Sequence, residues 1–256
     1  MIPRALRQIY SSPIDGNVEV SFFEIYNERI YDLLSATKPA TKRSLSRGDS
    51  SSSYDASNYS SRRSLDLRED KSGRFAVKDL RQIRVNGYEE AMYQLKQGLK
   101  SRATAITQSN NQSSRSHSIF QIVLERRGVI SKLRIVDLAG SEKYSFRQDL
   151  PAAEKAVKAK EVAFINSSLS TLGLCISALA DTTRRPPHVP YRNSKLTRVL
   201  RDSLDESSNV SMIICVSASR SHVSETLSTL QFANRAKRAV LPQNPSSYDS
   251  PRIMPN

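Results

Sequence analysis

The sequence predicts an α/β fold, and two kinds of pattern carry this prediction. Short segments rich in Val, Ile and Phe, typical of strands, occur at 18–27, 118–126, 132–138 and 210–217. Longer segments with apolar residues every three or four positions, typical of amphipathic helices, occur at 88–102, 151–180 and 222–238. A chain of 256 residues is long enough to bury a substantial core, as one large domain or two small ones.

Composition indicates a partner of opposite charge. The net charge is +14 and the sequence pI is about 10.0, which favours a polyanionic partner and says little about the fold. No uninterrupted apolar run reaches about 18 residues, the length that spans a membrane. The N-terminal MIPRALRQIY lacks the apolar core of a signal sequence. The chain is therefore expected to be soluble and cytoplasmic, with no membrane partner.

The cysteines and histidines do not predict a metal centre. Cys175 and Cys215 both lie in apolar segments, so we expect two buried thiols and a reducing environment. The histidines at 117, 188 and 222 lack the spacing of zinc ligands.

The first third of the chain predicts a helix, a strand, an insertion and a hairpin. Residues 1–12 place four apolar side chains on one helical face: Ile2, Leu6, Ile9 and Tyr10. A strand at 18–27 follows the turn SSPIDGN. Residues 35–64 are mostly Ser, Arg, Lys and Asp and predict a disordered insertion, whose serines could accept phosphate or simply belong to a tolerated surface loop. SLDLRED and RFAVKDL then predict a hairpin that turns at 71–73.

The remaining two thirds alternate helices and strands. A helix at 88–102 is followed by the polar loop NNQSSRSH at 110–117 and by strands at 118–126 and 132–138. The long helix at 151–180 carries one apolar stripe, which consists of Ile165, Leu169, Leu172, Ile176 and Leu179. A shorter helix at 193–204, a buried strand at 210–217 and a last helix at 222–238 precede a flexible Pro- and Ser-rich tail at 240–256.

The stretch KLRIVDLAGSE at 132–142 carries the clearest chemistry. Its apolar residues predict a strand covered on both faces, which places Asp137 at the carboxyl end of a central strand. Ligands bind at that edge of open α/β sheets, and an acid there commonly holds magnesium beside a nucleotide. Gly140 offers a backbone N–H that no Cβ shields from a phosphate. Taken alone, the same pattern is also compatible with ordinary structure.

Together with NNQSSRSH at 110–117, the DLAGSE motif at 137–142 resembles the switch loops of the kinesin motor domain. Three further motifs support this resemblance: FFEIYNERIYDLL at 22–34, HVPYRNSKLTRVLRDSL at 188–204 and ETLSTLQFANRAKRA at 225–239. They occur in the family's order and cover 1–239 almost completely. The resemblance implies a P-loop NTPase fold with a mixed central sheet flanked by helices, of which 1–239 would be a partial motor domain.

The resemblance also implies ATP and Mg²⁺ as cofactors and assigns roles to individual residues. Ser114 would coordinate the metal, and Asp137 would bind it through water. Gly140 would donate its N–H to the terminal phosphate, and Ser113 would hold the water chain to the nucleophile. The remaining residues implied are Asn110, in nucleotide and metal binding, and Arg115 and Glu142, as the ion pair that closes the pocket. An incidental surface ion pair is the alternative for the last two.

The segment at 184–201 predicts a binding surface for an acidic polymer. On a helix that begins near 193, the side chains of Lys195, Arg198 and Arg201 share one face and form a basic stripe. Such a stripe alone fits nucleic acid as well, although the lack of Trp and of interleaved aromatic residues disfavours this partner. The resemblance implies microtubules as the partner, with contacts from Tyr191, Arg192, Lys195, Arg198 and Arg201.

The chain departs from the family pattern in its phosphate cradle. None of its eight glycines is followed by lysine, so no P-loop ending in Gly-Lys-Ser/Thr is present. Two explanations stay open: a truncated reading of a longer kinesin, or a shortened relative that binds microtubules without ATP turnover. Ser167 also replaces a lysine that is common in the family. The expected function is a microtubule motor ATPase, with a non-catalytic microtubule-binding module as the alternative.

Overall fold

The computed structural model describes the chain over residues 1–35, 62–71, 73–106, 112–140, 152–180, 188–204 and 208–238. The chain divides into two compact units, one of Met1–Glu69 with Ala76–Ser167 and the other of Asp70–Phe75 with Ser168–Asn256. The predicted tail at 240–256 and most of the predicted insertion at 35–64 lie outside the described residues.

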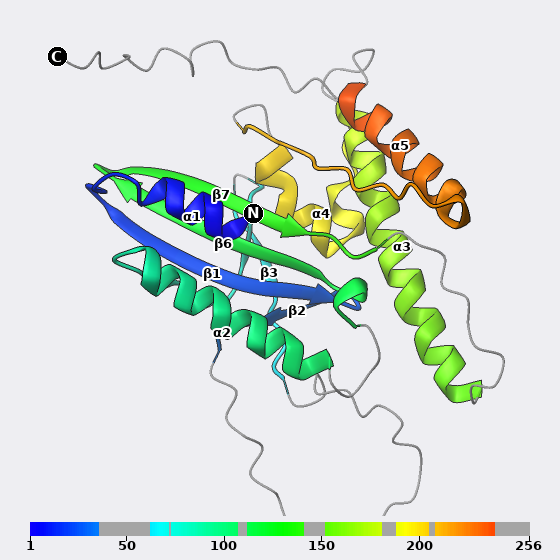
Figure 1. The fold of residues 1–256 in the computed structure, drawn as a ribbon, viewed down its shortest axis with the longest axis horizontal. Helices are drawn as coiled ribbons and strands as arrows, with labels where there is room; N and C mark the ends of the chain where they lie inside the picture. The colour runs from blue at the N-terminus through cyan, green and yellow to red at the C-terminus, as the bar shows by residue number, and fades with distance from the viewer. Residues whose placement is uncertain are drawn as a thin grey trace, which may run out of the picture. The chain divides into compact units, whose positions relative to one another are not determined.

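The first unit is built on a five-stranded antiparallel sheet (Figure 1). The strands lie in the order β2, β1, β6, β7, and β5 also pairs with β1. Their bounds are Asn17–Tyr26 for β1, Arg29–Asp32 for β2, Ile83–Arg84 for β5, His117–Arg126 for β6 and Val129–Asp137 for β7. The strands predicted at 18–27, 118–126 and 132–138 are therefore confirmed.

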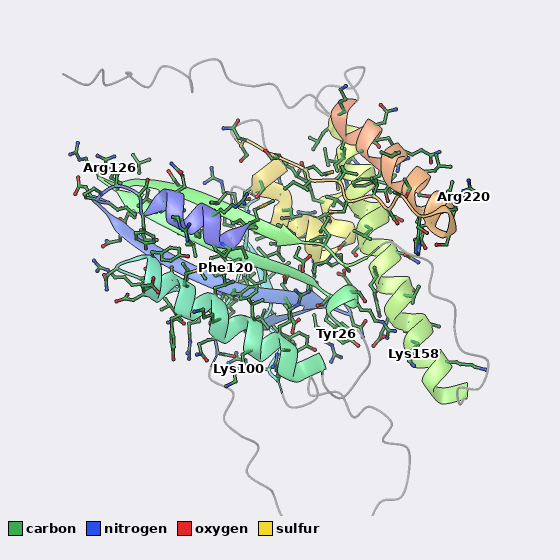
Figure 2. All side chains as sticks on the ribbon, in the orientation of Figure 1. Tyr26, Lys100, Phe120, Arg126, Lys158 and Arg220 are labelled. Carbon is green, nitrogen blue, oxygen red and sulfur yellow. The ribbon has the colours of Figure 1, made fainter. Side chains whose placement is uncertain are left out.

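Helices α1 (Ile2–Ile9) and α2 (Tyr88–Ile106) pack on one face of this sheet, which confirms both predicted helices. Alternate side chains of β1 and β6 point toward these helices, as the two-residue period of a strand requires. The rings of Phe22 and Phe120 meet edge to face with centroids 5.5 Å apart, and Figure 2 shows Phe120 within this layer. The buried core comprises Leu6, Val18, Val20, Phe22, Leu33, Leu34, Val85, Ala91, Leu95, Phe120 and Ile122.

Close packing between α2 and β1 depends on Gly98. A Cβ at this position would lie 2.2 Å from the Phe22 ring, which is itself fully buried. Any larger residue would push the helix away from the strand.

The expectation that 132–138 is a strand buried on both faces is wrong. Leu133 is 41% exposed, and Val129 and Ile130 are more exposed still. Among the described residues β7 pairs with β6 along one edge, whereas a central strand has two neighbours. The apolar composition predicted the strand but not its position in the sheet.

The buried strand predicted at 210–217 is also wrong. Residues 208–219 are described without strand structure, and Ile213 is 62% exposed. A strand needs hydrogen-bonded neighbours, and no strand in the described ranges supplies them here. Consequently Cys215 is exposed, against the prediction of a buried thiol, whereas Cys175 is buried as predicted. Burial raises the pKa of the Cys175 thiol to about 11.

Three further helices agree with the sequence pattern. They are α3 (Ala152–Ala180), α4 (Lys195–Leu200), which continues as the 3₁₀ turn η3 (Arg201–Leu204), and α5 (Val223–Arg238). Phe232 of α5 reaches α3 where Gly173 leaves room for its ring.

One stretch of α3 is long and apolar enough to cross a membrane. Lys158–Leu179 has a mean hydropathy of 1.6, and 33% of it is buried. Core helices of globular domains can reach the same hydropathy. The buried positions here include the polar residues Glu161, Ser168 and Thr171 beside apolar ones.

A second, two-stranded sheet forms a small hairpin. Strands β3 (Leu67–Glu69) and β4 (Phe75–Val77) pair as the sequence predicted. The turn between them contains Gly73 with φ +78°, a conformation that favours glycine.

Candidate functional site

Two polar segments meet at one edge of the sheet. The 3₁₀ turn η1 (Gln112–Arg115) leads into β6, and β7 ends at Asp137, directly opposite Ser118 of β6. The N–H of Gly140 donates to the carbonyl of Ser114 at 2.9 Å and so ties the two segments together. The structure thus brings Ser114, Asp137 and Gly140 into one neighbourhood, and their predicted roles remain predictions.

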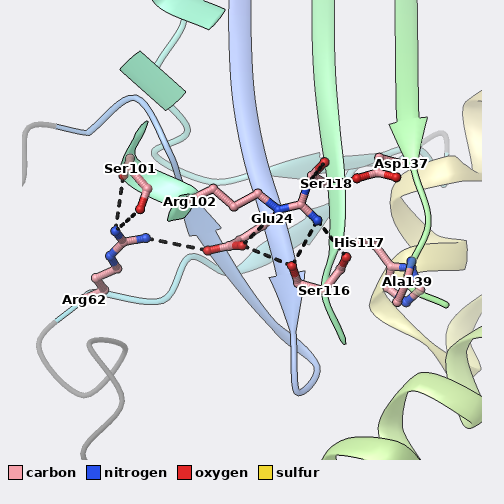
Figure 3. A network of polar contacts seen from close by, with 9 residues as sticks. All are labelled: Glu24, Arg62, Ser101, Arg102, Ser116, His117, Ser118, Asp137 and Ala139. Carbon is pink, nitrogen blue, oxygen red and sulfur yellow. Dashed lines mark hydrogen bonds and ion pairs between the residues drawn. The ribbon is translucent and has the colours of Figure 1, made fainter. Parts of the chain in front are cut away.

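Asp137 is held by an arginine that the sequence analysis did not single out. Arg102, near the end of α2, donates from one terminal nitrogen to Asp137 at 2.8 Å and to Ser118 at 3.1 Å (Figure 3). Its other terminal nitrogen donates to the carbonyl and the hydroxyl of Ser116. Arg102 is almost fully buried, whereas the Asp137 side chain is 68% exposed and open to water.

A second carboxylate lies behind this pair. Glu24 of β1 is fully buried, with Arg62 at 3.6 Å, Arg102 at 4.0 Å and the Ser116 hydroxyl donating at 3.3 Å. Arg62 also donates to the carbonyl of Ser101 at 2.8 Å. A carboxylate without solvent needs such partners because the loss of hydration otherwise costs several kcal/mol. We call Glu24, Arg62, Arg102, Ser116, Ser118 and Asp137 the Glu24 network.

Arg62 moves the boundary of the predicted insertion. Residues 62–64 were expected to be disordered, yet Arg62 belongs to the Glu24 network and Leu65 pairs with Ile30 by an N–H···O bond of 2.8 Å. The part of the insertion from 36 to 61 lies outside the described residues.

His117 links the ends of the two strands. Its Nδ1 accepts the N–H of Ala139 at 3.0 Å, so this nitrogen carries no proton. Burial lowers the pKa of His117 to about 4; the positive charge of Arg102 also lowers it, and Asp137 opposes both by raising it. The ring is therefore neutral near pH 7 and serves as a hydrogen-bond acceptor.

Arg115 contacts the long helix α3. Its guanidinium donates to the buried carboxylate of Glu161 at 2.8 Å, and the hydroxyl of Tyr26 donates to the other oxygen of the same carboxylate. The predicted partner Glu142 lies outside the described residues. In this structure the charge-assisted bond of Arg115 therefore joins the loop before β6 to α3.

The other predicted residues of this site are only partly described. Asn110 lies outside the described residues, and for Ser113 only the backbone, in η1, is described. Mg²⁺ at nucleotide sites is bound by oxygen atoms of hydroxyls, carboxylates and water, and phosphate oxygens complete its coordination shell. No group of three or more His, Cys, Asp or Glu in the described ranges could hold a metal alone. The predicted roles of Ser114 and Asp137 in holding Mg²⁺ together with phosphates therefore stay predictions.

The basic segment at 188–204 is a second cluster, in which some cations are exposed and others donate hydrogen bonds to backbone carbonyls. Ser194 is the N-cap of α4, and its side chain accepts the N–H of Leu196 at 3.1 Å. Arg192 is exposed, and Lys195, Arg198 and Arg201 are half-buried. Arg198 donates from Nε to the Arg192 carbonyl at 3.0 Å.

Arg201 has an internal role that its predicted surface role did not include. It follows the last residue of α4 and donates to the carbonyl of Gly73 at the hairpin turn. Its guanidinium also lies 5.6 Å from the centre of the Tyr191 ring and 5.9 Å from that of Phe75. Arg201 thus joins the 70–75 turn to the 191–204 segment, within one unit.

Sequence reasoning missed four important side chains: Glu24, Arg62, Arg102 and Glu161. Two of them left a signal. Glu24 interrupts the apolar strand FFEIY, and Glu161 opens the apolar half of α3. A charge at a buried position implies a partner, but the partner itself is remote in sequence.

Comparison with known proteins identifies relatives along nearly the whole chain. The family model described as kinesin motor domain matches residues 1–239. The chain is 36% identical to Kinesin-like protein KIF7 of Homo sapiens, over 93% of this chain and 17% of that protein. It is 38% identical to Kinesin-like protein Klp61F of Drosophila melanogaster, over 93% of this chain and 21% of that protein. The chain spans about a fifth of the length of these relatives.

Proposed function

Because the chain belongs to the kinesin motor-domain family, we propose that it binds microtubules and couples this binding to ATP hydrolysis as part of a motor. One observation carries the proposal beyond family membership. The loop before β6 contacts the segment after β7 through Ser114 and Gly140, and contacts α3 through Arg115 and Glu161. A change in this loop can therefore reach both a phosphate-binding segment and a long helix.

The residues of the site suit a phosphate switch. Ser114 and Asp137 would hold Mg²⁺, the latter through water, and the metal would neutralise charge on the transferred phosphoryl group. Gly140 would give its N–H to the terminal phosphate. That N–H donates to Ser114 in this structure, so phosphate binding requires it to change acceptor. Exchange of this acceptor separates the two loop states.

Arg115 supplies the connection to the helix. While it pairs with Glu161, the loop and α3 are joined by a charge-assisted bond between two largely buried groups. Its pairing with Glu142 instead, as the family resemblance implies, would release α3. We propose this exchange as the step that transmits the nucleotide state.

The basic segment supports the choice of partner. Tubulin polymers are acidic, and Arg192, Lys195 and Arg198 lie on one short stretch of the second unit. We propose these cations and Tyr191 as microtubule contacts, with a microtubule-associated location in the cytoskeleton. Arg201 contributes mainly by holding the hairpin turn in place.

Co-sedimentation with microtubules tests the proposal. Binding is measured at several salt concentrations, with and without ATP, and with duplex DNA as a competing polyanion. Release by ATP supports the motor. Salt-sensitive binding that ignores ATP supports a non-catalytic module instead, and equal affinity for DNA contradicts a specific filament surface. The 256 residues contain no Gly-Lys pair of a P-loop. ATP binding to this chain is therefore measured separately, as a control for the experiment with ATP.

A matched pair of variants locates the surface. Arg192→Gln removes an exposed cation from the basic segment, and Arg126→Gln removes one from the far end of β6, which Figure 2 shows at the tip of the sheet. Loss of binding with the first variant alone supports the proposed surface. Equal loss with both variants indicates a general charge effect.

A further inference from the structure

The starting point is the division of charge within the Glu24 network. Its two carboxylates and two guanidiniums balance, but the two carboxylates differ in environment (Figure 3). Glu24 is fully buried, and Asp137 is 68% exposed. Glu24 therefore depends entirely on protein groups for its solvation, and Asp137 can use water.

Arg102 lies between the two acids and favours the exposed one. Both of its terminal nitrogens are used by Asp137, Ser118 and Ser116. Its Nε lies 4.0 Å from the Glu24 carboxylate, which is beyond hydrogen-bond distance. On electrostatic grounds this choice is unexpected, because an arginine gains more from a buried carboxylate than from a hydrated one.

Arg62 resolves this contradiction. Its guanidinium is 3.6 Å from Glu24, closer than that of Arg102 and at ion-pair rather than hydrogen-bond distance, and its bonds to the carbonyl and hydroxyl of Ser101 fix it there. We propose that Arg62 is a positioning residue for Asp137: by compensating Glu24, it lets Arg102 extend to Asp137. The inference rests on the proposed role of Asp137 as the acid of the nucleotide site.

The consequence is a link between the insertion and the switch segment. Arg62 is the first residue after Ser35 that the structure describes, so the end of the predicted insertion is attached to the network that holds Asp137. Without Arg62, the buried carboxylate would draw Arg102 toward β1. Asp137 would then lose its ion pair although neither residue of that pair had changed.

A double-mutant cycle between Arg62 and Asp137 tests the inference on the 256-residue chain, without nucleotide or microtubules. Asp137→Asn should change the unfolding equilibrium constant about fivefold in the parent chain, as expected for a half-exposed ion pair. In the presence of Arg62→Gln the same change should be less than about twofold. An unchanged fivefold effect overturns the inference, because the two side chains would then act independently.

Two controls separate positioning from general damage. Arg63→Gln removes a neighbouring arginine that is 80% exposed and pairs with Asp79; its effect should add to that of Asp137→Asn without coupling. Glu24→Gln removes the charge that attracts Arg102, so adding it to Arg62→Gln should restore the effect of Asp137→Asn. Failure of this restoration overturns the inference.

The cycle remains informative if Arg62→Gln does not fold. Arg62→Lys keeps a cation near Glu24 and loses the paired bonds to Ser101, so the effect of Asp137→Asn should fall between the two limits above. A full fivefold effect with lysine contradicts a role for the guanidinium fork. Because these measurements use no nucleotide, their failure leaves the proposed motor function standing, and failure of ATP-dependent release leaves the positioning role standing.

Discussion

The chain uses arginine in two regions that differ in what the guanidinium contacts. In the Glu24 network, Arg62 and Arg102 face carboxylates, and the opposite charges cancel inside the protein. In the basic segment at 188–204, Arg198 and Arg201 donate to backbone carbonyls, and Arg201 also lies against aromatic rings. A carbonyl or a ring face orients a guanidinium without cancelling its charge.

The difference separates two functions of one residue type. Buried arginines that face carboxylates hold polar groups of several segments in place, and the effects of replacing them should depend little on salt. Arginines that are oriented by carbonyls or rings on the basic segment can present their charge to an acidic partner, and the effects of replacing them on binding should depend strongly on salt. We therefore expect the network to act in switching and the basic segment to act in binding.

Of the arginines in the two regions, we expect Arg102 to contribute most to stability. Arg102→Met removes the guanidinium shared by two carboxylates and leaves Glu24 with less compensation, which should lower the free energy of unfolding by about 3 kcal/mol. Chemical denaturation measures the change. Arg126→Met, at an exposed pair with Asp15, should cost under about 0.5 kcal/mol. Similar losses in both variants would show that the Glu24 network contributes no special stability.

His117, beside the Glu24 network, should make the stability of the fold depend on pH. Its folded pKa of about 4 lies below the ordinary value of 6.5, mainly because of burial. As the pH falls from 6.5 toward 4, His117 is protonated in the unfolded chain but stays neutral in the folded chain. The free energy of unfolding therefore decreases in this window, and the decrease levels off below pH 4. The full effect is up to about 3 kcal/mol.

A variant without an ionisable side chain at position 117 isolates this effect. His117→Asn retains an acceptor for the Ala139 N–H, and the difference in unfolding free energy between pH 7 and pH 5 should be smaller than in the parent chain. If His117→Asn shows the same pH dependence of stability as the parent chain, His117 does not titrate as its burial implies.

Local patterns predicted the elements better than their neighbours. The helix at 88–102 and the strand at 118–126 follow from periodicity alone, because each pattern is complete within one segment. The prediction of a strand at 210–217 was wrong because composition indicates that a segment can pair in a sheet, not that a neighbouring strand is present to pair with it. The same gap explains why 132–138 was expected to be buried on both faces.

The candidate site shows the same limit at the level of side chains. Asp137 and Ser114 could be found because they end or precede strands in a recognisable motif. Arg102 and Glu24 lie 35 and 113 positions before Asp137, and no local pattern relates them. Arg201 was predicted to be a surface cation because charge and helical spacing do not reveal a carbonyl acceptor in a distant hairpin.

Gly73→Ala tests whether Arg201 truly joins the hairpin turn to the basic segment. At φ +78° the alanine Cβ would lie 2.9 Å from the Arg201 guanidinium, so strain and clash add. Gly128 has the same φ with nothing within 4 Å of an added Cβ. Gly128→Ala should therefore cost the backbone term alone, about 1 kcal/mol, and Gly73→Ala should cost more by thermal or chemical unfolding. Equal costs would show that Arg201 yields without consequence.

The smallest expected effect concerns the salt dependence of microtubule binding. Arg192→Gln should weaken binding by about twofold to fivefold at low salt, because an exposed ion pair contributes up to about 1 kcal/mol, and the difference from the parent chain should shrink as salt screens the charge. Arg201→Gln should act differently, since it releases the hairpin turn: its effect on binding should persist at high salt. Co-sedimentation across a salt series distinguishes the two. If both variants lose their effect in parallel, Arg201 acts as one more surface charge, and the distinction between orienting and binding arginines does not hold within the basic segment.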